Sequence, residues 1–249
     1  MITALTWRPV LTTSTLTVVP GVEVKRPSRP GVARYCGGVA RTRQKAAAKD
    51  GYHHGDLPRA LIAAAERLIE KKGPARLTLR EAARIAGVSV AAPYRHFADK
   101  EALMAAVLTK GFVELTRTTE EARERGRTPI AALSGVGVAY VRFAAAHGSI
   151  YRLMFGPGLE KAQHPELLAA GKEALGVVVK AVRTCQESKV IAAGNTEQIA
   201  LAGWAICHGL ASLHVDGTLA TVLPVDIEQT ARSLIKMLLE GIAVRDTRD

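Results

Sequence analysis

The fold of this chain is decided by the segment LTLREAARIAGVSVAAPYRHFADKEAL, residues 77–103. It opens on Thr78 with Glu81 in the capping-box position, where each side chain can reach the other residue's backbone N–H and begin a helix. Gly87 then supplies a tight turn, and Ser89 can cap a second helix. The segment therefore predicts two short helices joined by a glycine-containing turn, which is a helix-turn-helix.

The second helix of this pair is expected to run from Ser89 to about Phe97. Pro93 would disrupt a helix centre, but the carbonyl that its ring crowds belongs to the capping Ser89, so the damage falls at the helix edge. The outward face is expected to comprise residues 89–96. The apolar residues that pack the pair onto the preceding helix are Ala82, Ala83, Ile85 and Val88.

Helices with a regular apolar period flank this segment on both sides. Asp56 can cap a helix that tolerates Pro58 in its first turn, and Gly73 with Pro74 end that helix. Asp99 caps a long helix on the other side. Glycine and proline breaks then separate predicted helices at 99–124, 129–147, 149–155, 165–188, 196–215 and 226–242.

The composition favours an all-α fold. Hydrophobic residues make up 48% of the 249 residues and aromatic residues only 4%, so Ala, Leu and Val dominate rather than the β-branched and aromatic mixture of strands. No alternating strand pattern and no repeat of fixed period is present in the sequence. The chain is long enough for a substantial core.

Positive charge is concentrated toward the N-terminus. Residues 1–50 hold 9 Lys and Arg against 2 acidic residues, residues 51–110 hold 10 against 6, and residues 111–249 hold 15 against 15. This asymmetry is typical of a polyanion-binding module joined to a neutral remainder. A basic tail that only solubilises the chain is the alternative.

Residues 1–50 contain several prolines and no sustained apolar period, so we expect a disordered basic extension. The run from Arg41 to Lys49 is interpreted as a flexible arm, with a helix formed against a phosphate backbone as the alternative. Thr and Ser interrupt the mildly apolar residues 10–24, which disfavours a signal peptide. A start at Val39 is a further hypothesis for this segment.

Cysteine usage and hydropathy favour a soluble, cytoplasmic protein with no membrane partner. The cysteines at Cys36, Cys185 and Cys207 are scattered and odd in number, which indicates a reducing compartment rather than a disulfide framework. No stretch approaches the ~20 apolar residues of a membrane span.

The helix-turn-helix segment strongly resembles the DNA-binding domain of the TetR family of bacterial regulators. The chain departs from the family pattern at Ala91, where Gly is frequent, and at Pro93. The preceding YHHGDL, residues 52–57, looks like the lead-in of one subgroup. The pattern T, IA, AGVS, Y-x-HF and K-x-x-L is matched by Thr78, Ile85-Ala86, Ala86 to Ser89, Tyr94-x-His96-Phe97 and Lys100-x-x-Leu103.

The resemblance implies a homeodomain-like three-helix DNA-binding domain at residues 51–98, after the extension 1–50. A C-terminal helical bundle for ligand binding and dimerisation would occupy residues 99–249. The implied function is a transcriptional regulator, more often a repressor, that a small-molecule effector releases from its operator. Ligand bound among the C-terminal helices would change the spacing of the recognition helices, with the helix from Lys100 as the lever.

The resemblance also implies residue roles in binding double-stranded DNA. Apolar side chains at the bases would read only thymine methyl groups and groove shape. Phe97 is interpreted as core, whereas Arg80 and Arg95 stay open between phosphate contact and solvated surface. The residues expected at phosphates are Thr78, Tyr94, His96 and Lys100. Those expected at base edges are Ser89, Val90, Ala92 and Pro93.

A homodimer on a palindromic operator is expected, because one recognition helix covers too few base pairs for useful specificity. Apolar stripes in the last two long helices are the candidate interface, and filling of the monomer core is the alternative. The stripes comprise Ile199, Ile206, Leu210 and Leu213 in one helix and Ile227, Leu234, Ile235 and Leu238 in the other.

The C-terminal segment WAICHG, residues 204–209, looks like the W-x-x-x-H-G pattern of one TetR-family C-terminal type. Trp204 and His208 share a helix face, so they form either a pocket wall or a packed Trp above a core His bonded to a carbonyl. Ligand sites are mostly apolar with a few polar anchors. Further candidates for lining a pocket, with core packing as the alternative, are Phe112, Tyr140, Phe143, Tyr151, Met154 and Phe155.

No motif supports an enzyme or a metal site. Cys207, His208 and His214 are the nearest approach to a catalytic set, but no motif supplies a nucleophile, an orienting acid and oxyanion donors together. The pairs His53-His54 and His208/His214 lack the spacing of zinc ligands. We therefore expect no catalytic residue, no metal and no cofactor.

Overall fold

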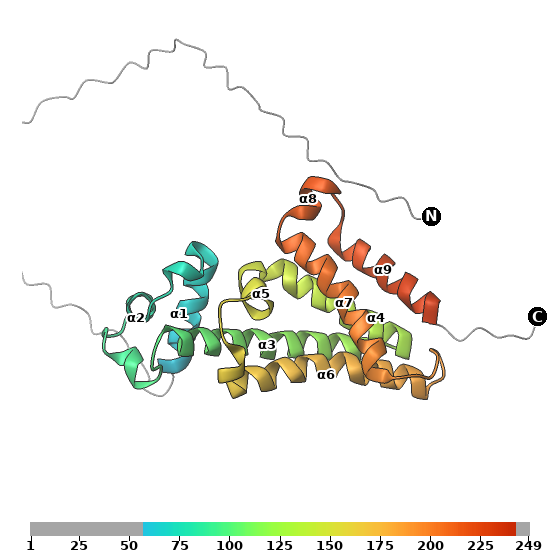
Figure 1. Cartoon of the computed structure of the whole chain (residues 1–249), viewed down its shortest axis with the longest axis horizontal. Coiled ribbons are helices and arrows are strands. Elements are labelled where there is room, and N and C mark those ends of the chain that lie inside the picture. Colours follow the sequence, from blue (N-terminus) through green and yellow to red (C-terminus); the bar gives the residue numbers. More distant parts are fainter. Residues whose placement is uncertain (1–56, 243–249) are drawn as a thin grey trace, which may run out of the picture. The chain divides into compact units, whose positions relative to one another are not determined.

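The computed structural model describes residues 57–242, and within this range the chain is all-α, as the composition predicts. The expected basic extension with Cys36 and Val39, the Asp56 cap and the His53-His54 pair lie outside the described residues. Helix α8 is not expected from the sequence. The helices are α1 (Leu57–Lys72), α2 (Leu79–Ala86), α3 (Lys100–Arg125), α4 (Pro129–Ala146), α5 (Gly148–Phe155), α6 (Pro165–Glu187), α7 (Thr196–Val215), α8 (Thr218–Val222) and α9 (Ile227–Ile242) (Figure 1).

Helix α2 begins as the capping pattern predicts, but only half of the reciprocal box forms. The Thr78 hydroxyl accepts a hydrogen bond from the Glu81 backbone N–H at 3.1 Å. The Glu81 carboxylate accepts instead from the Arg84 guanidinium, at 3.1 and 3.2 Å. Arg84 offers two N–H donors and a full positive charge, whereas the Thr78 backbone offers one neutral N–H, so Arg84 competes successfully for this carboxylate.

The second helix of the pair is not an α-helix, which corrects the prediction for residues 89–97. Gly87 ends α2 with φ 72°, the left-handed conformation expected there. The chain then makes a turn and a short 3₁₀ helix, Ala92–Arg95. Pro93 is the physical reason, because it has no N–H to return to the Ser89 carbonyl and continue an α-helical ladder.

Helix α3 connects the front helices with the rest of the described chain. Asp99 caps it, since the carboxylate accepts from the Ala102 backbone N–H at 2.8 Å. On one side Lys110 pairs with Glu66 of α1 at 2.5 Å. Further along, Glu120 pairs with Lys180 of α6 at 2.8 Å, and α3 and α6 run side by side (Figure 1).

Helices α4 and α7 are long and apolar enough to cross a membrane by length and composition alone. This corrects the expectation that no stretch reaches that threshold. Both helices pack within the fold, with Val141 and Ala144 of α4 and Ala200 of α7 fully buried. Core helices of soluble proteins pass the same compositional test, so these two helices are weak evidence for a membrane span.

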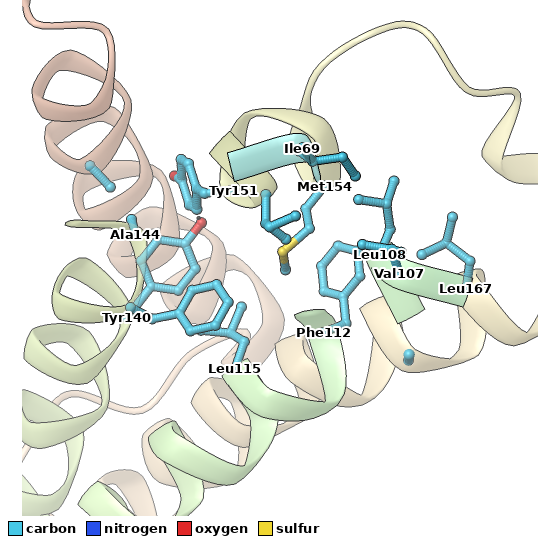
Figure 2. Packing of buried hydrophobic residues seen from close by; sticks show 14 of the residues in the cluster. Ile69, Val107, Leu108, Phe112, Leu115, Tyr140, Ala144, Tyr151, Met154 and Leu167 are labelled. Carbon is cyan, nitrogen blue, oxygen red and sulfur yellow. Dashed lines mark hydrogen bonds between the residues drawn. The ribbon is translucent and has the colours of Figure 1, made fainter. Parts of the chain in front are cut away.

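One continuous cluster of buried side chains extends from α1 to α9. It joins Leu61 and Phe97 of the front helices to Val107 of α3 and Ile235 of α9. Figure 2 shows the part of this cluster around Phe112. The expected boundary at residue 98 therefore falls inside a shared core.

Gly87→Ala is expected to lower the free energy of unfolding by about 1 kcal/mol, because an L side chain disfavours the left-handed backbone. A Cβ at this position would meet nothing within 4 Å, so no steric clash contributes. Gly87→Asn should recover part of the loss. Urea unfolding of the three proteins measures the effect, and an Ala variant as stable as the parent would contradict the assigned conformation.

Candidate functional site

The four residues expected to contact phosphates are all exposed. Thr78 precedes α2, Tyr94 is 60% exposed, His96 follows the 3₁₀ helix and Lys100 begins α3. Phe97 lies between them and is only 8% exposed, which confirms its interpretation as a core residue. Its ring anchors the segment whose polar neighbours face solvent.

The residues expected to face base edges differ in exposure. Ser89 and Val90 are exposed, and Ala92 is half-buried. Pro93 is buried, so it does not present its ring to a base edge, which corrects the expectation. The tight turn after Gly87 packs the 3₁₀ helix against α2, and Pro93 fills that contact.

Positive charge on this surface is not neutralised by nearby acids. Arg80, Arg95 and Lys100 are exposed, and none of them pairs with a carboxylate that the structure describes. Arg84 differs, because Glu81 holds it. Arg80 lies in the first turn of α2, where the backbone N–H groups also favour anions.

An apolar cavity of about 350 Å³ lies among the helices that follow. Side chains of α3, α4, α5, α6, α7 and α9 wall it, and Gly137, Gly171 and Gly203 leave parts of the wall without side chains. This volume lies within the ~300–1,000 Å³ of small-molecule sites. The cavity is therefore large enough to hold a ligand.

The predicted pocket residues separate into three groups. Phe143 does not line the cavity, which corrects the prediction, because its ring packs against His147 at a centroid distance of 4.9 Å. Tyr151 and His208 border a separate neighbouring hollow. The predicted residues that line the cavity are Phe112, Tyr140, Met154, Phe155 and Trp204.

A hydrogen-bonded cluster of aromatic side chains closes one end of the cavity. His208 Nδ1 lies 2.8 Å from Tyr140 Oη and 2.7 Å from Tyr151 Oη. The two hydroxyl oxygens are 3.2 Å apart and turn toward each other in Figure 2. The Trp204 indole N–H donates to Tyr140 Oη at 3.2 Å. His208 is thus bonded to tyrosines rather than to the expected carbonyl.

Burial keeps this cluster neutral. It raises the pKa of Tyr140 and Tyr151 and lowers the pKa of His208, because each charged form loses hydration. The neutral imidazole can accept a hydrogen bond from a tyrosine hydroxyl at Nδ1. Burial also raises the pKa of the cavity-wall Cys207 to about 11, so this residue is a thiol rather than a reactive thiolate.

Lys161 also lines the cavity, although the sequence reasoning did not select it. It lies in a short 3₁₀ turn between α5 and α6, where no apolar periodicity marks a position as facing inward. Its Nζ donates to the Gly156 carbonyl at 2.7 Å. A charged side chain is therefore part of an otherwise apolar wall.

The stripes expected at a dimer interface point mainly inward. Leu210 and Ile235 are each 6% exposed, and Ile199 and Leu238 line the cavity, so these four residues fit the alternative of an inward-facing stripe rather than the expected dimer interface. Ile206, Ile227 and Leu234 are partly buried, and Leu213 is 45% exposed. The inward face of α7 packs on α4 and α9, which explains the burial of the stripe.

Helix α7 has an exposed apolar face, and α9 exposes a large apolar side chain. Leu201 is 53% exposed and Met237 is 67% exposed, and Ala205 and Gly209 are exposed between Leu201 and Leu213. Residues 198–215 contain no Asp, Glu, Lys or Arg. The lack of charge along a half-exposed helix is the sequence signal that could have identified this face.

Comparisons with known proteins agree with this arrangement. Residues 61–107 match the family model for bacterial regulatory proteins of the tetR family, and residues 133–238 match that for the tetracyclin repressor-like C-terminal domain. The chain belongs to the TetR family. It is a DNA-binding transcriptional regulator and not an enzyme.

Several solved structures resemble this TetR-family chain. A protein with unknown function from Rhodococcus sp. RHA1 is 34% identical, with a TM-score of 0.68 over 79% of this chain and 100% of that one. PfmR from Thermus thermophilus, a TetR family transcriptional regulator, is 20% identical, with a TM-score of 0.57 over 72% and 97% of the two chains. FadR from Bacillus halodurans, a fatty acid degradation regulator, is 13% identical, with a TM-score of 0.61 over 76% and 97%. The last two show the fold alone, and no curated protein matches.

The stability of this regulator is expected to fall as the pH drops below about 6.5. Because burial lowers the pKa of His208 in the folded state, the unfolded chain takes up the proton first, and the stability is lost as pH falls through the folded value. The paired Glu120 titrates far lower, with a pKa of about 2. Urea unfolding between pH 7.5 and 5.5 measures the trend, and His208→Phe should flatten it. An unchanged slope in the variant would contradict this assignment.

Proposed function

We propose that this TetR-family regulator is a homodimeric repressor that binds a palindromic operator through the surface around α2 and the start of α3. The supporting observation is the set of exposed side chains Thr78, Tyr94, His96 and Lys100 around the N-terminus of α2 and the start of α3. Phosphates bind at helix N-termini and to hydroxyl, imidazole and ammonium groups. The repressor acts in the cytoplasm, at the nucleoid.

Base readout in this proposal is largely apolar. Of the residues expected at base edges, Ser89 and Val90 are exposed and Ala92 is half-buried. They offer methyl contacts to thymine and one hydroxyl, so groove shape and half-site spacing carry much of the specificity. Arg80 and Arg95 are placed on phosphates in this arrangement, because both are exposed and without a described carboxylate partner.

Tyr94→Ala and Lys100→Ala are each expected to weaken operator binding by roughly tenfold, because each loses a hydrogen bond to a charged phosphate. Lys100→Ala should also reduce the salt slope by about one. The exposed Lys172 of α6 supplies the control variant Lys172→Ala. Genome-wide recovery of bound DNA supplies the operator, and gel-shift titrations at several salt concentrations measure the affinities. Unchanged affinity and slope would refute the contact assignment.

The proposed dimer uses the exposed face of α7 that includes Leu201 and Leu213. Small residues at Ala205 and Gly209 allow close approach of a second helix. A two-fold interface pairs the same surface with itself, and an uncharged helix face is suited to such pairing. Two recognition segments are then available for two half-sites.

Leu201→Glu is expected to convert the dimer to a monomer, because two-fold symmetry places the new charge in the interface twice. The matched control is Val113→Glu on α3, since Val113 is 54% exposed and Leu201 53%. Light scattering coupled to size-exclusion chromatography measures the mass of each variant. A Leu201→Glu protein that stays dimeric, or a Val113→Glu protein that dissociates equally, would place the interface elsewhere.

Effector binding in the cavity is proposed to release the operator through α3. This helix carries Lys100 at its start and Phe112, Leu115 and Thr119 in the cavity wall. About 18 Å of helix separates Lys100 from Phe112 at ~1.5 Å per residue. A ligand that binds one conformation of the dimer more tightly would favour that conformation. The position of the DNA-contacting end of α3 would then change. In this proposal Trp204 and His208 of the W-x-x-x-H-G pattern belong to the hydrogen-bonded end of the ligand cavity.

A further inference from the structure

The two ends of the cavity differ in chemistry. One end is formed by Leu133, Val182 and Ile199 with Thr119, whose hydroxyl donates to the Leu115 carbonyl of its own helix at 2.8 Å. This end therefore offers aliphatic contacts and no unused donor. A charged group placed there would lose its hydration without compensation.

The opposite end is aromatic and holds Lys161. Phe112 packs edge-on against Phe155, with 5.4 Å between the ring centroids, and the centroids of Phe155 and Trp204 are 6.2 Å apart. Gly171 of α6 faces Phe112, since a Cβ there would lie 3.8 Å from the ring. From Gly171 to Val182 the wall of α6 extends about 16 Å at ~1.5 Å per residue. The cavity is thus elongated, with its polar groups gathered at one end.

Lys161 is the polar group at this end with spare hydrogen-bonding capacity. Tyr140 and Trp204 bond to each other and to the His208 cluster, so their polar atoms are already satisfied. The ammonium of Lys161 carries three N–H donors, of which the Gly156 carbonyl takes one. Within residues 57–242 no carboxylate pairs with Lys161, and no other charged side chain lines the cavity.

The cavity volume indicates the scale of an occupant that fills it. At ~30 Å³ per non-hydrogen atom, as in liquid water, a volume of about 350 Å³ accommodates roughly a dozen atoms. An aliphatic chain of about ten carbons with one carboxylate has this size. A second charge at its far end would reach the aliphatic walls around Val182, where no partner is present among the described residues.

We infer that the effector is an elongated aliphatic monocarboxylate of about ten carbons, with its carboxylate at Lys161 and its chain directed toward Val182. This inference rests on the proposed function only for the consequence of binding, because the cavity and its charge are features of the chain itself. The carboxylate accepts hydrogen bonds from the remaining N–H donors of Lys161, and the aliphatic chain of the ligand packs against the apolar wall. A neutral alcohol or a dicarboxylate of equal length satisfies only one of these requirements.

The test uses full-length protein, decanoate and the fluorescence of Trp204, in a Trp7→Phe background that removes the second of the chain's 2 tryptophans. Decanoate is expected to bind about tenfold more tightly than decan-1-ol, and decanedioate more weakly still. Lys161→Met should weaken decanoate binding about tenfold and leave decan-1-ol binding unchanged. Lys161→Arg should restore affinity, and Lys172→Met on the exposed surface of α6 should have no effect.

Equal binding of decanoate and decan-1-ol, no effect of Lys161→Met, or no decanoate binding would each overturn the inference. These titrations contain no DNA, and operator binding is measured separately by gel shift. A protein that binds its operator but not decanoate refutes the ligand class and leaves the regulator proposal intact. A protein that binds decanoate through Lys161 but no operator refutes the proposed function and supports the ligand assignment.

Discussion

Helix α3 carries an apolar face that helices from both halves of the described chain share, and the burial of this face positions everything else. Leu103 and Val107 are fully buried near its start, and Phe112 and Leu115 reach the cavity. Packed helices resist continuous deformation, so a displacement at the cavity cannot be absorbed within a few residues. In the proposed mechanism, α3 transmits such a displacement to its first residue, Lys100.

The cavity interrupts this packing and therefore costs stability while it is empty. The polar groups at its wall do not add to this cost, because they form hydrogen bonds to one another and none is left unpaired. These groups belong to Tyr140, Tyr151, His208 and Trp204. Such a cluster is rigid and neutral, so it forms one end of the cavity without favouring a charged ligand group. In the proposed effector site, the cationic Lys161 is the feature that selects the class of ligand.

Helix α7 also has an apolar face that no other part of the described chain covers. Leu201 and Leu213 are about half exposed on a helix that has no charged side chain between residues 198 and 215. A solvated helix face ordinarily carries charges, so this surface is suited to a second copy of the chain. Dimerisation would place two DNA-contacting surfaces under the control of two cavities.

The sequence by itself determined the long helices, the caps at Thr78 and Asp99 and the turn at Gly87, because these interactions join residues within one helical turn of each other. It did not determine that Pro93 is buried in a 3₁₀ helix. Only the tertiary structure decided that Leu201 faces solvent while Leu238 and Lys161 face the cavity. Apolar periodicity marks a helix face, but whether that face meets core, cavity or solvent depends on helices distant in the sequence.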